Sequence, residues 1–271
     1  MKSRILVAAI GIPALLVVLL VLPEVITAIL IAAVCVYAVY ELLHNTDLAN
    51  NLYLMGISAV MAIAVCFWSF GGCPWPAAIV GMVLYWIALA IVLIASHGTL
   101  PFAQICIAAF SGIVIPLLLS SIARILMLSG GRYLVLLPFV ISFSADSGAY
   151  FVGVAIGKHK MAPILSPKKS WEGAVGGVLS AVILTVVYAL ILDMAFGLTV
   201  RYGAAILYGL FGSVVSILGD LFFSAIKRQT GIKDFSHLLP GHGGVLDRFD
   251  SMSLVAPLTE ALLLTIPMIV M

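Results

Sequence analysis

The chain has 271 residues, of which 64% are hydrophobic and only 9% charged, and its formal net charge is +2 at pH 7. This composition excludes a soluble domain built around one core, and so small a net charge does not indicate nucleic-acid binding. The four cysteines have neither disulfide nor metal-ligand spacing, so we interpret them as small buried hydrophobic residues.

Apolar stretches long enough to cross a membrane follow one another along the chain. A helix needs about 20 apolar residues to span roughly 30 Å of hydrocarbon. We predict an all-α, polytopic membrane protein with about nine such helices, approximately at residues 4–22, 24–43, 52–70, 77–95, 101–128, 133–156, 174–193, 203–226 and, around Glu260, near the C-terminus. The first stretch follows basic residues, as a signal peptide does, but its length and the lack of a clear cleavage site favour a helix. Glu41, His44 and Asp47 are interpreted as a short polar loop between two spans.

Two of the predicted spans carry polar side chains on one face. At helical spacing these side chains form stripes, which are Ser142, Asp146 and Tyr150 in one span and Ser213, Ser216, Asp220, Ser224 and Lys227 in the other. A carboxylate inside a bilayer costs several kcal/mol unless it meets water, a partner or an ion. Asp146 and Asp220 are therefore candidate functional residues, with a structural hydrogen bond between helices as the alternative. For Glu260 a functional role and packing or pairing inside the helix bundle are equally consistent with the sequence.

Charged residues concentrate in two loops, residues 157–173 and 227–250. Two predicted crossings separate these loops, so both face the same side of the membrane. Because most Lys and Arg residues fall on that side, the positive-inside rule makes it cytoplasmic. Taken alone, Lys168 and Lys169 would be markers of this topology. Beside the second loop they become predicted phosphate contacts.

The second loop combines residue types that suit phosphate and its metal ion. Arg grips phosphate in a bidentate manner and Lys acts as a point charge. Asp247 and Asp250 are three residues apart, so a helix that begins near Val245 would present both from one face. Magnesium is held by one or two carboxylates together with substrate oxygens. The glycines around His242 permit positive φ angles and close approach to a ligand. A merely solvated loop is the alternative, but the density of both charge signs beside glycines favours a site.

Both loops resemble one family of membrane enzymes, the phosphatidate cytidylyltransferases, also called CDP-diacylglycerol synthases. The second loop matches its signature in the run Ser224-x2-Lys227-Arg228-x4-Lys233-Asp234-x7-His242-Gly243-Gly244-x2-Asp247-Arg248-x-Asp250. The earlier segment is similar to the family at Asp146, Ala149, Tyr150, Gly157, Lys158, Ser166, Pro167, Lys169, Ser170, Glu172 and Gly173.

The resemblance implies a reaction in which CTP and phosphatidic acid give CDP-diacylglycerol and pyrophosphate, by attack of the lipid phosphate on the α-phosphorus of CTP. It implies a metal site at Asp146, Asp220, Asp247 and Asp250, with magnesium as the ion and a second metal or a monovalent cation left open. The catalytic residues would be Asp220, Asp247, Asp250, Lys227, Arg228 and His242, although His242 shapes the turn equally well. The substrate phosphates would contact Lys168, Lys169, Ser170, Ser224, Lys227, Arg228, Lys233, Asp234, Gly243, Gly244 and Arg248.

The resemblance also carries expectations about organisation and setting. We expect a catalytic region at residues 131–271, and an N-terminal helical region at residues 1–130 for dimer packing or lipid entry. The family implies a homodimer, and we expect membrane lipid as a partner and no nucleic acid. The compact length and the lack of a targeting extension lead us to expect the cytoplasmic membrane of a bacterium. The nearest alternative is a CTP-dependent polyprenol or phytol kinase, which has less use for a second set of phosphate-binding residues. An ion-coupled transporter would not need the charged loop clusters, and a scaffold would not need buried carboxylates.

Overall fold

The computed structural model describes residues 11, 13–72, 74–238 and 243–270. Contacts between residues divide the chain into two compact units. Unit 1 comprises Met1–Arg124 and Gln229–Arg248, and unit 2 comprises Ile125–Arg228 and Phe249–Met271. The charged segment that follows residue 228 therefore belongs by its contacts to the N-terminal helices.

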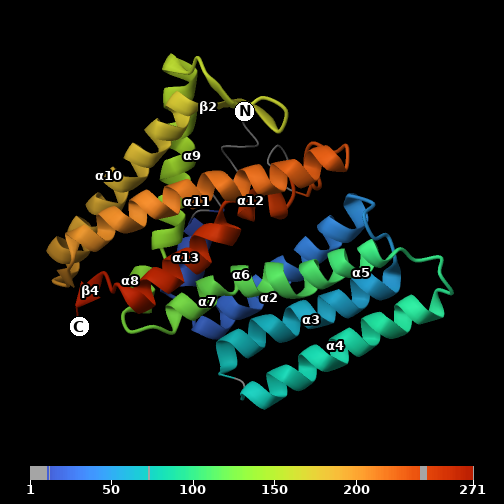
Figure 1. Ribbon diagram of the computed structural model, residues 1–271. Coiled ribbons are helices and arrows are strands. Elements are labelled where there is room, and N and C mark those ends of the chain that lie inside the picture. Colours follow the sequence, from blue (N-terminus) through green and yellow to red (C-terminus); the bar gives the residue numbers. More distant parts are fainter. Residues whose placement is uncertain (1–10, 12, 73, 239–242, 271) are drawn as a thin grey trace. The chain divides into compact units, whose positions relative to one another are not determined.

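Unit 1 is built around long apolar helices. Helix α2 (Glu24–Tyr40) lies beside α3 (Leu52–Gly71), and α3 also packs against α4 (Trp75–Ala95) (Figure 1). The side chain of Asn51 accepts hydrogen bonds from the N–H groups of Tyr53 and Leu54 and so caps the start of α3. The unit also contains the π-helical turns η1 (Glu41–Asn45) and η2 (Phe110–Val114), and the helices α5 (Phe102–Ala109), α6 (Ile115–Leu119), most of α7 (Ser121–Leu126) and most of α12 (Leu246–Phe249).

Unit 2 is a second group of helices with two short antiparallel strand pairings. Its helices are α8 (Gly131–Leu134), α9 (Leu137–Ile156), α10 (Trp171–Phe196), α11 (Tyr202–Gln229, whose last residue belongs to unit 1) and α13 (Met252–Thr265). Strand β1 (Lys160–Ala162) pairs antiparallel with β2 (Ser166–Ser170), with Lys160 opposite Ser170. Strand β3 (Thr199–Val200) pairs antiparallel with β4 (Ile269–Val270). The charged loop predicted at 157–173 is thus a small β-hairpin that leads directly into α10.

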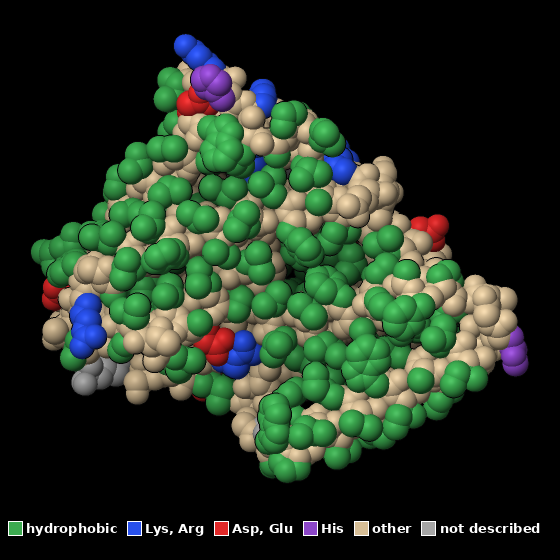
Figure 2. All heavy atoms as spheres, viewed as in Figure 1, with side chains coloured by type: hydrophobic (Ala, Val, Ile, Leu, Met, Phe, Trp, Pro, Cys, Tyr) green, Lys and Arg blue, Asp and Glu red, His purple; other side chains and the backbone are tan. Residues whose placement is uncertain are grey.

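Within the described residues, seven helical stretches are long and apolar enough to cross a membrane: Glu24–Asn45, Leu52–Gly71, Trp75–Ala95, Phe102–Leu126, Gly131–Ile156, Trp171–Phe196 and Tyr202–Gln229. Hydrophobic side chains also cover most of the face seen in Figure 2. The protein is therefore an all-α, polytopic integral membrane protein, as the composition predicted. Residues 4–10 and 12 of the first predicted span, 4–22, lie outside the described residues, and residues 13–20 of that span are helical. Helix α13 has 14 residues, which at about 1.5 Å per residue is shorter than the roughly 30 Å of hydrocarbon.

Small residues bring α9 and α10 into close contact along their length. A Cβ atom added at Gly177 would lie 2.7 Å from the carbonyl oxygen of Ala145, and one added at Gly173 would lie 2.7 Å from that of Ala149. Close approach through small residues is the usual way in which membrane helices pack. Because Asp146 follows Ala145 on α9 and the β2 strand precedes α10, this packing fixes the distance between that carboxylate and the hairpin.

We expect Gly177→Ala to destabilise unit 2 by about 1–3 kcal/mol, because the added methyl group meets backbone atoms that cannot move independently. The measurement is the thermal unfolding midpoint of the purified protein in detergent. Gly203→Ala in α11 is the matched control, since a Cβ atom there meets nothing within 4 Å. Its midpoint should stay the same or rise slightly. Equal midpoints for the two variants would contradict the packing argument.

Candidate active site

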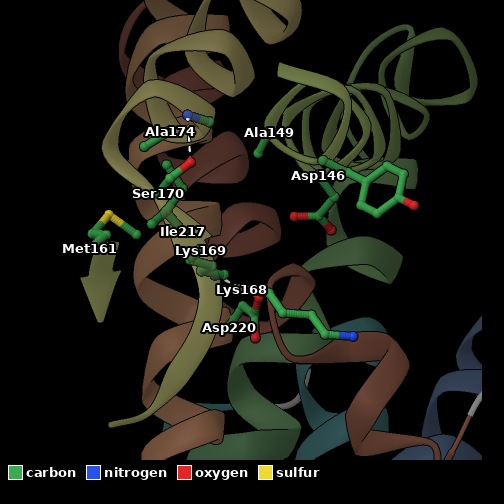
Figure 3. Close-up of a pocket in the computed structure, with 11 residues that line it drawn as sticks. Asp146, Ala149, Met161, Lys168, Lys169, Ser170, Ala174, Ile217 and Asp220 are labelled. Atoms are coloured by element: carbon green, nitrogen blue, oxygen red, sulfur yellow. Dashed lines mark hydrogen bonds and ion pairs between the residues drawn. The ribbon is translucent and has the colours of Figure 1, made fainter. Parts of the chain in front are cut away.

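A hollow in unit 2 brings together residues of the first charged loop, 157–173, and of the two predicted polar stripes. Its lining comprises Asp146, Ala149, Tyr150, Met161, Lys168, Lys169, Ser170, Gly173, Ala174, Ile217 and Asp220. Figure 3 shows Asp146 on α9 and Asp220 on α11, with Lys168 and Lys169 coming from β2. The volume of about 200 Å³ is below the roughly 300–1,000 Å³ of a typical ligand pocket. The hollow thus suits a small charged part of a ligand, such as a phosphate group.

Asp220 holds a lysine ammonium at this hollow. Its Oδ2 atom lies 2.6 Å from Nζ of Lys169, and its Oδ1 atom accepts a hydrogen bond of 3.1 Å from the hydroxyl of Ser224. The side chains of Lys169 and Asp220 are 22% and 28% exposed, so a ligand has access to both. Ser224 lies one helical turn after Asp220, which is the spacing that the predicted polar stripe on this helix required.

A second carboxylate at the hollow is that of Asp146, on α9. It lines the hollow together with Tyr150, one helical turn further along the same helix. Ser142, the third member of the predicted stripe, is buried one turn before Asp146. The four-residue spacing read from the sequence therefore corresponds to a helix face that runs from the core to the hollow.

A third carboxyl group, that of Asp250, belongs to the same electrostatic neighbourhood. The pKa of Asp250 is raised to about 7, mainly by its burial, further by the negative charge of Asp220 and to a lesser extent by Asp146, while Lys227 acts in the opposite direction. Its carboxylate also accepts a 2.7 Å hydrogen bond from the N–H of Ser251. In this environment a positive charge would favour the ionised form of Asp250.

The carboxylate oxygens of unit 2 fit a cation whose remaining ligands come from water and a bound substrate. Among the residues that the structure describes, no three His, Cys, Asp or Glu side chains converge to form a complete metal site. Two carboxylates nevertheless line the hollow, and their negative charge adds to the effect of burial in raising the pKa of Asp250. Magnesium is commonly bound by one or two carboxylates, with water and substrate phosphates as the other ligands. The residues present are compatible with that arrangement.

Other predicted site residues of unit 2 have structural contacts of their own. Ser170 is buried and caps α10, because its hydroxyl oxygen accepts the N–H of Gly173 at 3.2 Å. Lys227 is buried in the last turns of α11, and Nε of Arg228 donates to the carbonyl oxygen of Leu165 at 3.2 Å. Arg228 thereby ties the end of α11 to the loop that joins β1 and β2.

The rest of the predicted signature lies in unit 1. Asp247 is buried, and its Oδ2 atom accepts the N–H groups of Phe235 at 2.8 Å and of Gly244 at 2.9 Å. Gly243 has a φ angle of 81°, the left-handed conformation that glycine permits. Of the other signature residues, Lys233, Asp234 and Arg248 are exposed, Gly244 is buried, and His242 lies outside the described residues.

The structure differs from the sequence analysis at the helix expected near Val245. Helix α12 does begin at Leu246, but it ends at Phe249. Asp250 lies beyond that end, with its side chain bonded to the N–H of Ser251. Asp247 and Asp250 therefore do not share a helix face.

Glu41 is the polar residue whose position sequence reasoning missed. It was interpreted as part of a short loop, but it is completely buried in the π-helical turn η1. Its carboxylate accepts hydrogen bonds from the signature segment of unit 1. A carboxylate at the end of an apolar span was the only signal available, since the partners lie about two hundred residues away.

Comparison with known proteins gives a consistent result. A family model described as "Cytidylyltransferase family" matches residues 2–266. Phosphatidate cytidylyltransferase of Haemophilus influenzae is 43% identical over 127 residues, which cover 47% of this chain and 44% of the relative. That of Staphylococcus saprophyticus is 41% identical over 138 residues, which cover 51% of this chain and 52% of the relative. The matched stretches thus span about half the length of these curated relatives.

Proposed function

The chain belongs to the cytidylyltransferase family, and from this premise we propose that it transfers the cytidylyl group of CTP to phosphatidic acid. The products are CDP-diacylglycerol and pyrophosphate. Relatives about 40% identical over half of this chain are named phosphatidate cytidylyltransferase, which supports this choice of substrates. The structural observation that carries the proposal is the hollow of unit 2, which is lined by two lysines from β2 and by carboxylates from α9 and α11.

The proposed reaction brings two anions together. An oxygen of the phosphatidate phosphate forms a bond to the α-phosphorus of CTP, and the bond from that phosphorus to the bridging oxygen of pyrophosphate breaks. Positioning and charge neutralisation supply most of the catalysis in such transfers. Lys168 and Lys169 line the hollow, so their ammonium groups would bind the phosphates. Asp220 holds the ammonium of Lys169 in place at 2.6 Å.

The carboxylates have a second role in this proposal. Asp220, Asp146 and Asp250 would hold a divalent cation, with magnesium as the proposed ion, which neutralises phosphate charge when bound. We retain Asp247, Arg248, Lys233 and Asp234 as predicted metal or phosphate ligands on the strength of the signature, and the catalytic roles of Lys227 and Arg228 on the same basis. Location in a bacterial cytoplasmic membrane, a site that faces the cytoplasm and a homodimer remain part of the proposal.

The test uses CTP labelled at different phosphates, with purified protein in detergent and phosphatidic acid. Label from the α-phosphate is expected in a lipid that co-migrates with CDP-diacylglycerol, and label from the γ-phosphate is expected in pyrophosphate. Chelation of divalent cations should abolish the lipid product. Label from the γ-phosphate in lipid would instead identify a kinase, and absence of lipid label from a folded protein would overturn the proposal.

A further inference from the structure

Glu41 lies at the end of the first span of unit 1 that the structure describes. The span Glu24–Asn45 ends in the π-helical turn η1, and Glu41 is the first residue of that turn. Its relative exposure is 0%. A buried carboxylate is strongly unfavourable unless hydrogen-bond donors satisfy its oxygens, so its partners indicate why it is there.

All the hydrogen bonds that the structure shows for this carboxylate come from the signature segment. Oε1 accepts the hydroxyl of Ser236 at 2.6 Å and the N–H of Val245 at 2.8 Å. Oε2 accepts the N–H of Leu246 at 2.7 Å. The amides at the start of a helix have no carbonyl partner within it, and Leu246 is the first residue of α12. Glu41 thus supplies the acceptors that fix where α12 begins.

Further contacts hold the same segment against η1. Nδ2 of Asn45 donates to the carbonyl oxygen of Phe235 at 2.9 Å, and the N–H of Phe235 donates to Asp247 at 2.8 Å. The side chain of Phe235 is 1% exposed, so it anchors the segment in the core of unit 1. One turn of a membrane helix therefore holds the signature segment at two places, near Ser236 and at Val245.

The glycine at position 244 is explained by the same carboxylate. A Cβ atom at Gly244 would collide with Oε1 of Glu41, and it would lie 2.8 Å from the hydroxyl oxygen of Ser236. Only glycine leaves room for the carboxylate beside this backbone. The requirement for glycine at this position follows from a side chain about two hundred residues earlier in the chain, and it needs no contact between Gly244 and a substrate.

We infer that Glu41 is a positioning residue for the transfer reaction, which acts by holding the backbone of residues 244–246 and, through it, Asp247 and Arg248. The inference rests on the proposed function, in which these two signature residues are ligands. It also gives the N-terminal region a defined task, the support of the signature segment. Misplacement of a reacting group by about 1 Å can cost on the order of 100-fold in rate, so the effect of Glu41 should be visible in kcat.

Glu41→Gln is the main test variant because it preserves size. A glutamine side chain has one acceptor oxygen where the carboxylate has two. The oxygen can still accept from Ser236 and Val245, and the NH2 group then faces the N–H of Leu246. We therefore expect the backbone amide of Leu246 to exchange hydrogen about tenfold faster or more, while that of Val245 changes less. We expect kcat to fall by about tenfold.

Glu41→Ala removes every acceptor, so both amides should exchange faster and kcat should fall by about 100-fold. Glu24→Gln is the matched control, because Glu24 begins the same span and has no hydrogen bond to the signature segment among the contacts that the structure shows. Its exchange rates and kcat should stay within about twofold of the unchanged protein. If Glu41→Ala does not fold, Glu41→Gln decides the question by itself.

The readouts are amide exchange resolved to single residues in 243–249, kcat and KM with labelled CTP, and the thermal unfolding midpoint. A merely structural role would lower the midpoint and leave the kcat of the folded fraction unchanged. Unchanged exchange at Leu246 in Glu41→Gln, or faster exchange with unchanged kcat, would overturn the inference. If the unchanged protein makes no CDP-diacylglycerol, the proposed function fails, and the exchange rate of Leu246 still decides whether Glu41 holds the segment.

Discussion

Replacement of Asp220 by asparagine is expected to lower kcat for cytidylyl transfer by about 100- to 1,000-fold. Asparagine keeps the size of the side chain but removes the charge that pairs with Lys169 at 2.6 Å. It also removes a charged oxygen ligand from a hollow that must hold phosphate and its cation together. Because Asp220 is partly exposed at the hollow, its loss should affect the reaction more than the fold.

The measurement for Asp220→Asn is kcat and KM for CTP over a range of magnesium concentrations. Asp193→Asn is the matched control. The start of α10 lines the hollow, whereas Asp193 lies near the C-terminal end of that helix and accepts a 2.6 Å hydrogen bond from Tyr202. The control should retain activity within a few-fold. Near-normal turnover by Asp220→Asn, with a normal unfolding midpoint, would remove Asp220 from the catalytic site.

Replacement of Lys169 by methionine is expected to reduce kcat/KM for CTP by about 100-fold, because a charged hydrogen bond to a phosphate is lost. Methionine preserves the length of the apolar part of the side chain. Lys160→Met, in strand β1 of the same hairpin, is the control, since Lys160 is exposed and does not line the hollow. The control should change kcat/KM by no more than about twofold.

The ion pair between Lys169 and Asp220 also predicts that the losses of kcat/KM caused by the two substitutions are not additive. If Lys169 and Asp220 act as one unit, Lys169→Met should cost much less in the Asp220→Asn background than in the unchanged protein. Kinetics of the two single variants and the double variant measure this directly. Fully additive losses would show that the 2.6 Å ion pair has no role in the reaction.

The membrane fold could be predicted from composition because a bilayer leaves few alternatives. Backbone polar groups have no water partners in hydrocarbon, so apolar stretches of sufficient length become helices. Helical periodicity also placed Asp146 and Tyr150 on one face, and both line the hollow. These predictions depend only on local spacing, which a single sequence contains.

The contacts between distant segments could not be predicted in this way. Nothing in the spacing of residues 157–173 indicates the β1–β2 hairpin, which depends on pairing of Lys160 with Ser170. The hydrogen bonds of Glu41 to Val245 and Leu246 join segments separated by 204 and 205 positions. The end of α12 at Phe249 is a local feature, in which Asp250 follows the helix and its side chain accepts a hydrogen bond from the N–H of Ser251.

The measurement that tests the central claim most directly is a structure of the protein with phosphatidic acid and a CTP analogue. A methylene group between the α- and β-phosphorus atoms of the analogue would prevent the release of pyrophosphate. The account predicts nucleotide phosphates in the hollow of unit 2, in contact with Lys168 and Lys169 and close to Asp220. A nucleotide bound with its phosphates away from β2 and α11 would contradict it.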